Sequence, residues 1–192
     1  MNLTKLFEAQ AVLDRDIELH HPVEDGEDRL SKKILALLVE LGECANEFRG
    51  FKFWSNDQEP RTIKKHYADD MGAHFVWKTT NPLLEEYVDC LHFILSIGND
   101  LKMSQHNEVS DFFLAFKSVK HWTVINQFNY TFRQVMKFAE TVDKGKPDAF
   151  LFTRILRAVL QLGHKLGFNE SQIEQAYYDK NKINFERQKR GY

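Results

Sequence analysis

Several features that are common in proteins are scarce or missing in this chain. The two cysteines, Cys44 and Cys90, are too few for a disulfide framework, so we expect buried, reduced thiols. No apolar run approaches the roughly 20 residues that span a bilayer, and residues 1–10 lack the apolar region of a signal peptide. A formal net charge of −2 argues against a general nucleic-acid binder, because such domains usually carry a basic excess. We therefore expect a cytoplasmic protein that contacts neither membrane nor nucleic acid.

The chain does contain enough apolar sequence for one folded domain. Its 192 residues are 43% apolar and 28% charged, which is ordinary for a globular protein with a real core. Apolar side chains recur at helical spacing in six segments. These segments are 3–18, 28–48, 81–102, 122–142, 147–166 and a last helix that opens at Asn169. With no convincing strand alternation, the sequence predicts an all-α bundle of about six helices, forming a single domain over residues 1–192.

Two segments interrupt the helical pattern. Residues 55–80 and 104–121 are irregular, with weak periodicity, and we interpret them as insertions or lids. Several of the helical segments also have apolar faces that are wider than one bundle seam requires. That breadth predicts additional burial in a homodimer.

Two pairs of acidic residues stand inside apolar helical sequence. Glu40 and Glu43 are three residues apart, so both project from one face of their helix. Glu86 and Asp89 repeat this spacing in a second helix. Ionised carboxylates that leave water are costly unless a partner or a cation compensates them. Two facing pairs would form an all-oxygen site for a hard divalent cation, whereas either pair alone is more often a solvated helix edge.

Other polar residues could complete a ligand site. His92 continues the acidic face one turn after Asp89, where it is either functional or a satisfied core histidine. Trp54 follows a helix end, so its ring would either stack on a flat ligand or pack in the core. Gln10 and Asp14 lie four residues apart on the flank of the first helix, and the role of Asp14 stays open.

The last helix carries a polar stripe near its end. Lys180, Asn184 and Arg187 follow one another at i, i+4 and i+7, which places them on one face. A point charge, an amide and a planar guanidinium together suit phosphate oxygens. A basic helix end is also commonly just solvated, because cations are favoured there.

Three stretches carry a further signal: VELGE at 39–43, EEYVDCLHF at 85–93 and YYDKNKINFERQKRGY at 177–192. They resemble the motifs of dimeric, all-α dUTPases, which belong to the all-α NTP pyrophosphohydrolase superfamily together with MazG-like enzymes. FKFW at 51–54 and LFEAQAVLD at 6–14 are also similar to that family. The acidic pairs alone are typical of the whole superfamily, while the C-terminal pattern favours its dUTPase branch.

The resemblance implies a dimeric, Mg²⁺-dependent dUTP diphosphatase, which converts dUTP and water to dUMP and pyrophosphate. It implies two or more Mg²⁺ ions per site, bound by Glu40, Glu43, Glu86 and Asp89. It implies phosphate and sugar contacts from Lys180, Asn184, Arg187 and Tyr192. It also implies a base pocket shaped by Gln10, Trp54 and His92. A metal-activated water would be the nucleophile, and Glu40 or Glu43 would accept its proton.

Alternatives to this function stay open. The segment between the acidic pairs, 44–85, is longer than is usual in the family, which puts the base preference in question. A pyrophosphohydrolase of the same superfamily that acts on dCTP or on a modified nucleotide is one alternative. A catalytically silent helical regulatory protein is another, and the presence of all four acids counts against it.

Overall fold

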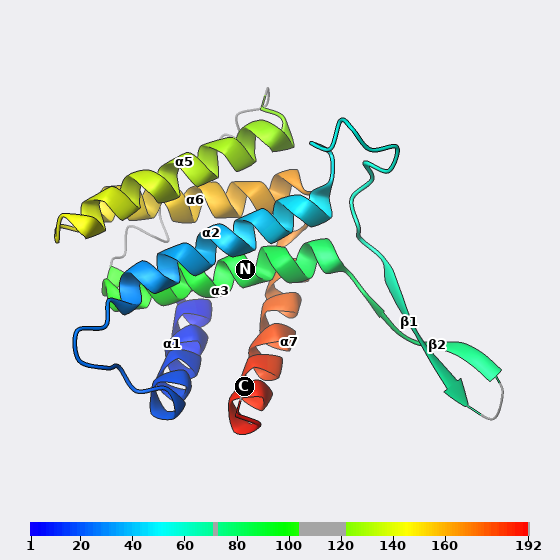
Figure 1. The fold of residues 1–192 in the computed structure, drawn as a ribbon, viewed down its shortest axis with the longest axis horizontal. Helices are drawn as coiled ribbons and strands as arrows, with labels where there is room; N and C mark the ends of the chain where they lie inside the picture. The colour runs from blue at the N-terminus through cyan, green and yellow to red at the C-terminus, as the bar shows by residue number, and fades with distance from the viewer. Residues whose placement is uncertain (71–72, 104–121, 192) are drawn as a thin grey trace.

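Six α-helices and one β-hairpin make up the described part of the chain, in a computed structural model that describes residues 1–70, 73–103 and 122–191 (Figure 1). The helices are α1 (Leu3–His20), α2 (Arg29–Phe48), α3 (Pro82–Asp100), α5 (Val124–Asp143), α6 (Ala149–Lys165) and α7 (Glu170–Lys189). The hairpin consists of β1 (Lys64–Asp70) and β2 (Ala73–Thr80). The expected all-α architecture is confirmed, while the predicted insertion at 104–121 lies outside the described residues.

Each of these helices begins at a side chain that caps its first turn. Every cap accepts a hydrogen bond from a backbone N–H of that turn. The caps are Asn2, Asp28, Asn81, Thr123, Asp148 and Asn169. Asn169 also forms a reciprocal capping box with Gln172, as its sequence predicts. These local signals explain why the helix starts could be predicted.

Helix α3 lies at the centre of the bundle, packed against α1, α2, α6 and α7. Figure 1 shows α2, α3, α5 and α6 lying roughly alongside one another, with α1 and α7 extending together from one side. Tyr87, Leu91 and Ile94 of α3 are completely buried. Gly163 allows α6 to approach α3, because a Cβ at that position would lie 2.4 Å from the Tyr87 side chain. This packing fixes the side chains that α3 presents to its neighbours.

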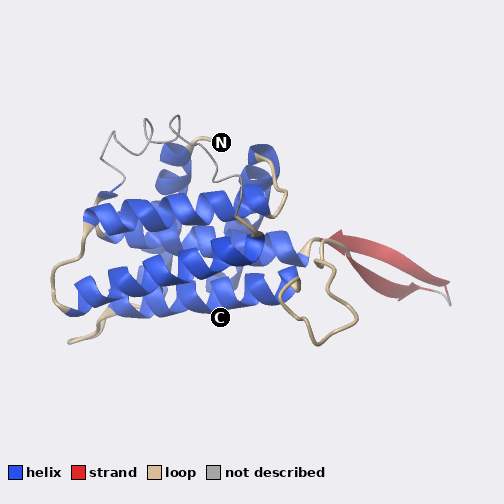
Figure 2. Ribbon diagram, turned by 90° about the horizontal axis from the view of Figure 1, so that it is seen from above, coloured by secondary structure: helices blue, strands red, loops and turns tan. Residues whose placement is uncertain are grey.

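The hairpin is the part of the fold that the sequence did not predict. Its strands pair antiparallel, with Lys64 opposite Thr80 at the base. A bulge between His66 and Tyr67 shifts the register further out. The hairpin projects from the helical body (Figures 1 and 2). Its large apolar side chains, such as Trp77, stay exposed, so the strands lack the alternation of half-buried strands by which sequence analysis recognises them.

The structure bears on two expectations from the sequence, which concern membrane-spanning segments and the two cysteines. None of the helices in the described ranges combines the length and apolar character that a membrane span requires. Cys44 and Cys90 are both buried and free, as expected. Their side chains interact across the α2–α3 contact. Because the cysteines directly follow Glu43 and Asp89, this contact helps to bring the two acidic pairs together.

Candidate active site

Three carboxylates meet between α2 and α3. Glu40 and Glu43 project from α2 and Glu86 from α3, and one oxygen of each lies within 4.8 Å of the others. The two helices run in opposite directions, so the C-terminal half of α2 faces the N-terminal half of α3 (Figure 1). The three-residue spacing on α2 therefore points both of its glutamates toward Glu86.

Burial and mutual repulsion oppose ionisation of Glu40 and Glu86. The pKa of Glu40 rises from 4.5 to about 7, first through burial and then through the charges of Asp89 and Glu43. The pKa of Glu86 also rises to about 7, through burial and then the same two neighbours. A hard divalent cation would relieve this repulsion, and carboxylate oxygens are suitable donors for Mg²⁺. The donor set and its uncompensated charge therefore fit a Mg²⁺ site.

Asp89 lies outside this group of three and binds a lysine of α7. Its Oδ2 accepts a hydrogen bond from Lys180 Nζ at 2.5 Å, and both side chains are largely buried. Burial raises the pKa of Asp89, while Lys180 and then Arg187 oppose the shift. The structure thus brings three of the four expected metal ligands together and pairs the fourth with a cation of the protein itself.

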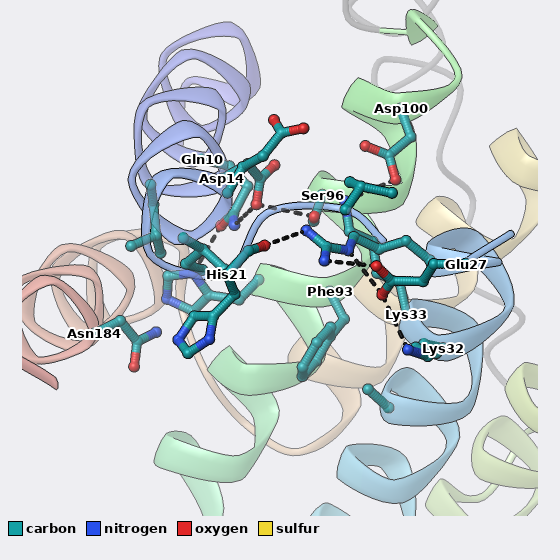
Figure 3. A pocket seen from close by; sticks show the side chains of 17 residues that line it. Gln10, Asp14, His21, Glu27, Lys32, Lys33, Phe93, Ser96, Asp100 and Asn184 are labelled. Atoms are coloured by element: carbon teal, nitrogen blue, oxygen red, sulfur yellow. Dashed lines mark hydrogen bonds and ion pairs between the residues drawn. The ribbon is translucent and has the colours of Figure 1, made fainter. Parts of the chain in front are cut away.

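A cavity of about 690 Å³ opens one helical turn away from the acids, toward the C-terminal half of α3 (Figure 3). It contains three of the residues that the resemblance assigns to substrate, which are Gln10, His92 and Asn184. Apolar side chains, among them Leu13 and Phe93, form other parts of its wall. Such a mixed lining is typical of sites that bury a base and a sugar.

A hydrogen-bond network fixes the polar side of this cavity. Gln10 Oε1 accepts a hydrogen bond from the Tyr177 hydroxyl at 2.9 Å and lies 2.8 Å from His92 Nδ1. Gln10 Nε2 donates to Asp14 Oδ1 at 2.8 Å, and Ser96 Oγ donates to the same oxygen at 2.9 Å. The His92 ring stacks on Tyr177 with its centroid 4.3 Å away. Burial lowers the pKa of His92 to about 3, so this ring is neutral.

Three members of this network were not assigned from the sequence. Asp14 was left open, and neither Ser96 nor Tyr177 was singled out. Asp14 lies one turn after Gln10 on α1, and Ser96 lies one turn after His92 on α3. Extending each polar face by one turn would have identified both. Tyr177 resembles an ordinary core aromatic, so its hydroxyl gave no signal in the sequence.

A second cavity, of about 820 Å³, reaches the other end of the acidic face. Glu86 lines it, together with Lys180 and Arg187 of α7. The base of the hairpin adds Lys64 and Lys78. Helix α7 therefore borders both cavities, since Asn184 lines the first and the two cations line the second. Although Glu47, Glu85 and Asp179 also line this cavity, its lysines and arginines suit phosphate groups.

One residue that the resemblance assigns to substrate, Trp54, lies outside both cavities. The Trp54 side chain is 65% exposed and lines neither of these cavities. It sits beyond the end of α2, where its ring makes edge contacts with Phe51 and Phe53. A contact of Trp54 with substrate therefore stays a prediction. Tyr192 lies outside the described residues.

Comparison with known proteins identifies the family to which the chain is similar. No curated protein matches the chain. The family described as dUTPase matches residues 2–82 and 76–192, two stretches that overlap and together span nearly the whole chain. They contain every residue of the acidic cluster and of the polar network. The chain therefore belongs to the all-α dUTPase family.

Proposed function

We propose that the protein is a Mg²⁺-dependent dUTP diphosphatase, which hydrolyses dUTP to dUMP and pyrophosphate. The observation that carries this proposal is the cluster of Glu40 and Glu43 on α2 with Glu86 on α3, because α3 borders two different cavities. One cavity has a mixed polar and apolar lining, and the other combines cations, among them Lys180 and Arg187, with acids. A nucleoside triphosphate has the matching order of a base and sugar, a scissile phosphoanhydride and a charged tail. Family membership favours uracil as the base.

The acidic residues would hold two or more Mg²⁺ ions. Glu40, Glu43 and Glu86 already converge, and Asp89 would join them from the next turn of α3. Bound Mg²⁺ supplies neutralisation of the phosphate charge and a water of lowered pKa. Glu40 is our choice for the group that takes the proton of the water, because it is a partly buried carboxylate with an oxygen within 4.8 Å of those of Glu43 and Glu86. Glu43, one turn away, is the second choice.

The remaining residues would position the substrate. Phosphoryl transfer depends mainly on orientation and charge stabilisation. Lys180 and Arg187 would contact the phosphates, and Asn184 and Tyr192 would add contacts to phosphate or sugar. The neutral His92 and the hydrogen-bonded Gln10 would form the base-side wall.

A second candidate substrate is dCTP, and Asp14 favours it. Asp14 Oδ1 is occupied by Gln10 and Ser96, whereas the buried Oδ2 has no partner in the described part of the chain. Burial raises the pKa of Asp14, and in its ionised form this carboxylate only accepts hydrogen bonds. It would match the exocyclic amino group of cytosine, whereas uracil offers a carbonyl at that position. The ratio of kcat/KM for dUTP and dCTP decides between the two substrates.

Pyrophosphate release from a panel of nucleoside triphosphates, with Mg²⁺ and with EDTA, tests the function. We expect the highest kcat/KM with dUTP and no release in EDTA. A preference for dCTP would move the protein to the second candidate. Absence of both Mg²⁺ binding and turnover would instead support a silent regulatory protein with this fold.

A further inference from the structure

The β1–β2 hairpin has one face that looks onto the acidic site. In its register His66 pairs with Lys78, and Lys64 pairs with Thr80 at the base. Because strand side chains alternate, these residues lie on the same face of the hairpin. All of them line the 820 Å³ cavity that also contains Glu86. Lys65, between Lys64 and His66, belongs to the opposite face and does not line the cavity.

The hairpin is held to the helical body at its base. The Arg61 backbone N–H donates to the Glu47 carbonyl oxygen at 2.9 Å, and the Leu83 N–H donates to the Arg61 carbonyl oxygen at 3.1 Å. The Arg61 guanidinium also forms an ion pair with the Glu47 carboxylate, with an N–O distance of 3.2 Å. These bonds join the hairpin to the end of α2 and the start of α3. The lysines near its base are therefore directed at the cavity rather than left at a free tip.

Lys64 and Lys78 differ from Lys180 and Arg61 of the same cavity in their ion pairing. Lys180 is engaged by Asp89, and Arg61 by Glu47. Lys64 and Lys78 form no ion pair with a residue of the described ranges, although both are exposed to solvent. Of the other acids in the lining, Asp179 accepts a hydrogen bond from Gln175, and Glu85 is exposed. The hairpin thus offers two ammonium groups that a polyanion could bind.

The position of the cavity along α3 indicates which polyanion this is. Glu86 lines the hairpin cavity, while Ser96 lines the opposite cavity with its polar network. Ten residues of α-helix separate them, a rise of about 15 Å. A nucleotide whose base occupies the Ser96 cavity and whose scissile bond reaches the acids would extend its outer phosphates toward the hairpin.

We propose that the hairpin is a pyrophosphate-binding arm, in which Lys64 and Lys78 bind the outer two phosphates of a nucleoside triphosphate and the pyrophosphate released from it. This proposal rests on the proposed function for its reaction, but not on the identity of the base. It gives the hairpin, which lies between the acidic pairs in the sequence, a role in binding the outer phosphates.

Binding of inorganic pyrophosphate and of dUMP, each measured by calorimetry in the presence of Mg²⁺, tests the arm. The double variant K64A/K78A should bind pyrophosphate at least about tenfold more weakly, because each lysine supplies a charge-assisted contact. Its affinity for dUMP should stay unchanged, since dUMP has no outer phosphates. The matched control K65A removes one lysine from the other face and should leave both affinities unchanged.

Two results would overturn the arm: unchanged pyrophosphate affinity in K64A/K78A, or an equal loss in K65A. The first would show that the lysines make no contact, and the second that only the net charge of the hairpin matters. Failure of the proposed function gives a different pattern. Pyrophosphate binding that depends on Lys64 and Lys78, without dUTP turnover, would keep the arm and assign the enzyme to another triphosphate.

Discussion

Single carboxylates of the site are harder to ionise in the folded chain than in the unfolded chain. Burial and neighbouring charges raise the pKa values of Glu40 and Glu86 to about 7, from an ordinary value of 4.5. Lys180 offsets part of this repulsion, but it bonds directly only to Asp89. Groups arranged to bind a cation therefore destabilise the fold when no cation is bound. This predicts opposite effects of one substitution on activity and on stability.

Replacing Glu86 with glutamine should abolish turnover while leaving the metal-free fold intact or more stable. The amide has nearly the same shape but removes a repelled charge. Changes to residues that merely support metal ligands lower activity about 10- to 100-fold, so loss of a ligand should lower kcat by more than about a hundredfold. Steady-state kinetics and thermal denaturation in EDTA measure the two effects, with the exposed Glu8→Gln of α1 as the control. Near-normal turnover would remove Glu86 from the site.

The metal-free protein should also show a pH dependence that comes from these glutamates. Between the ordinary pKa of 4.5 and the folded value of about 7, the folded state binds more protons than the unfolded state. Raising the pH through this window therefore lowers the free energy of unfolding. His92 acts in the opposite direction between about 3 and its ordinary value of 6.5, because its folded pKa is lowered.

Comparison with the double variant E40Q/E86Q removes the His92 contribution, which both proteins share. The difference in Tm between the variant and the unchanged protein, measured in EDTA, should grow as the pH is raised from about 5 to about 8. A difference that stays constant over this range would show that neither glutamate has a raised pKa.

For single residues, the sequence predicts which acids belong to the site but not which side chains they bind. The spacing of Glu40 and Glu43 fixes their common direction once a helix is assumed. The bond between Asp89 and Lys180 joins residues 91 positions apart, and that between Asp14 and Ser96 spans 82 positions. Such contacts depend on how whole helices pack, which spacing within one helix does not contain. Side chains whose role depends on another element therefore stayed open or were missed.

At the scale of elements, the helices were predictable because their capping residues and their apolar periodicity indicate the same structure. Asn81 and Pro82, for example, mark the start of α3 in the sequence, and the structure places the helix start there. The hairpin lacked such agreement because its strands are exposed on both faces. The contact of Trp54 with substrate stays a prediction. Arg49 caps α2 in a left-handed conformation, and the Trp54 side chain that follows is exposed in this single chain.

The close approach of α3 and α6 gives a test at this scale. Gly163→Ala should lower the free energy of unfolding by about 1–3 kcal/mol, because the new Cβ would overlap the buried Tyr87 ring. Gly42→Ala is the matched control, since Gly42 is also inside a helix but has nothing within 4 Å of the new Cβ. Helix propensity predicts that this control stabilises by up to about 1 kcal/mol. Chemical denaturation measures both, and equal effects at the two sites would contradict the packing argument.

At the scale of the whole molecule, the described part of the chain leaves large apolar side chains of α2 and α5 exposed. On α2 the Leu35 and Val39 side chains are 63% and 49% exposed, and they lie one turn apart on the same face. On the neighbouring helix α5, Met136 is 51% exposed. Exposed apolar patches of this kind commonly mark protein–protein contacts. The wide apolar faces noted in the sequence therefore include side chains that the monomer fold leaves uncovered.

We therefore predict a two-fold homodimer in which α2 and α5 of each chain meet their counterparts. Light scattering at micromolar concentration should give twice the chain mass of 22.6 kDa. The double variant L35E/V39E places four carboxylates in the dimer contact, two from each chain, and should shift the mass to that of one chain. Leu19→Glu is the control, because this α1 side chain is 82% exposed but lies on another helix, so its variant should stay dimeric. A mass of one chain for the unchanged protein would exclude the dimer, and dissociation by Leu19→Glu would place the interface on α1 instead.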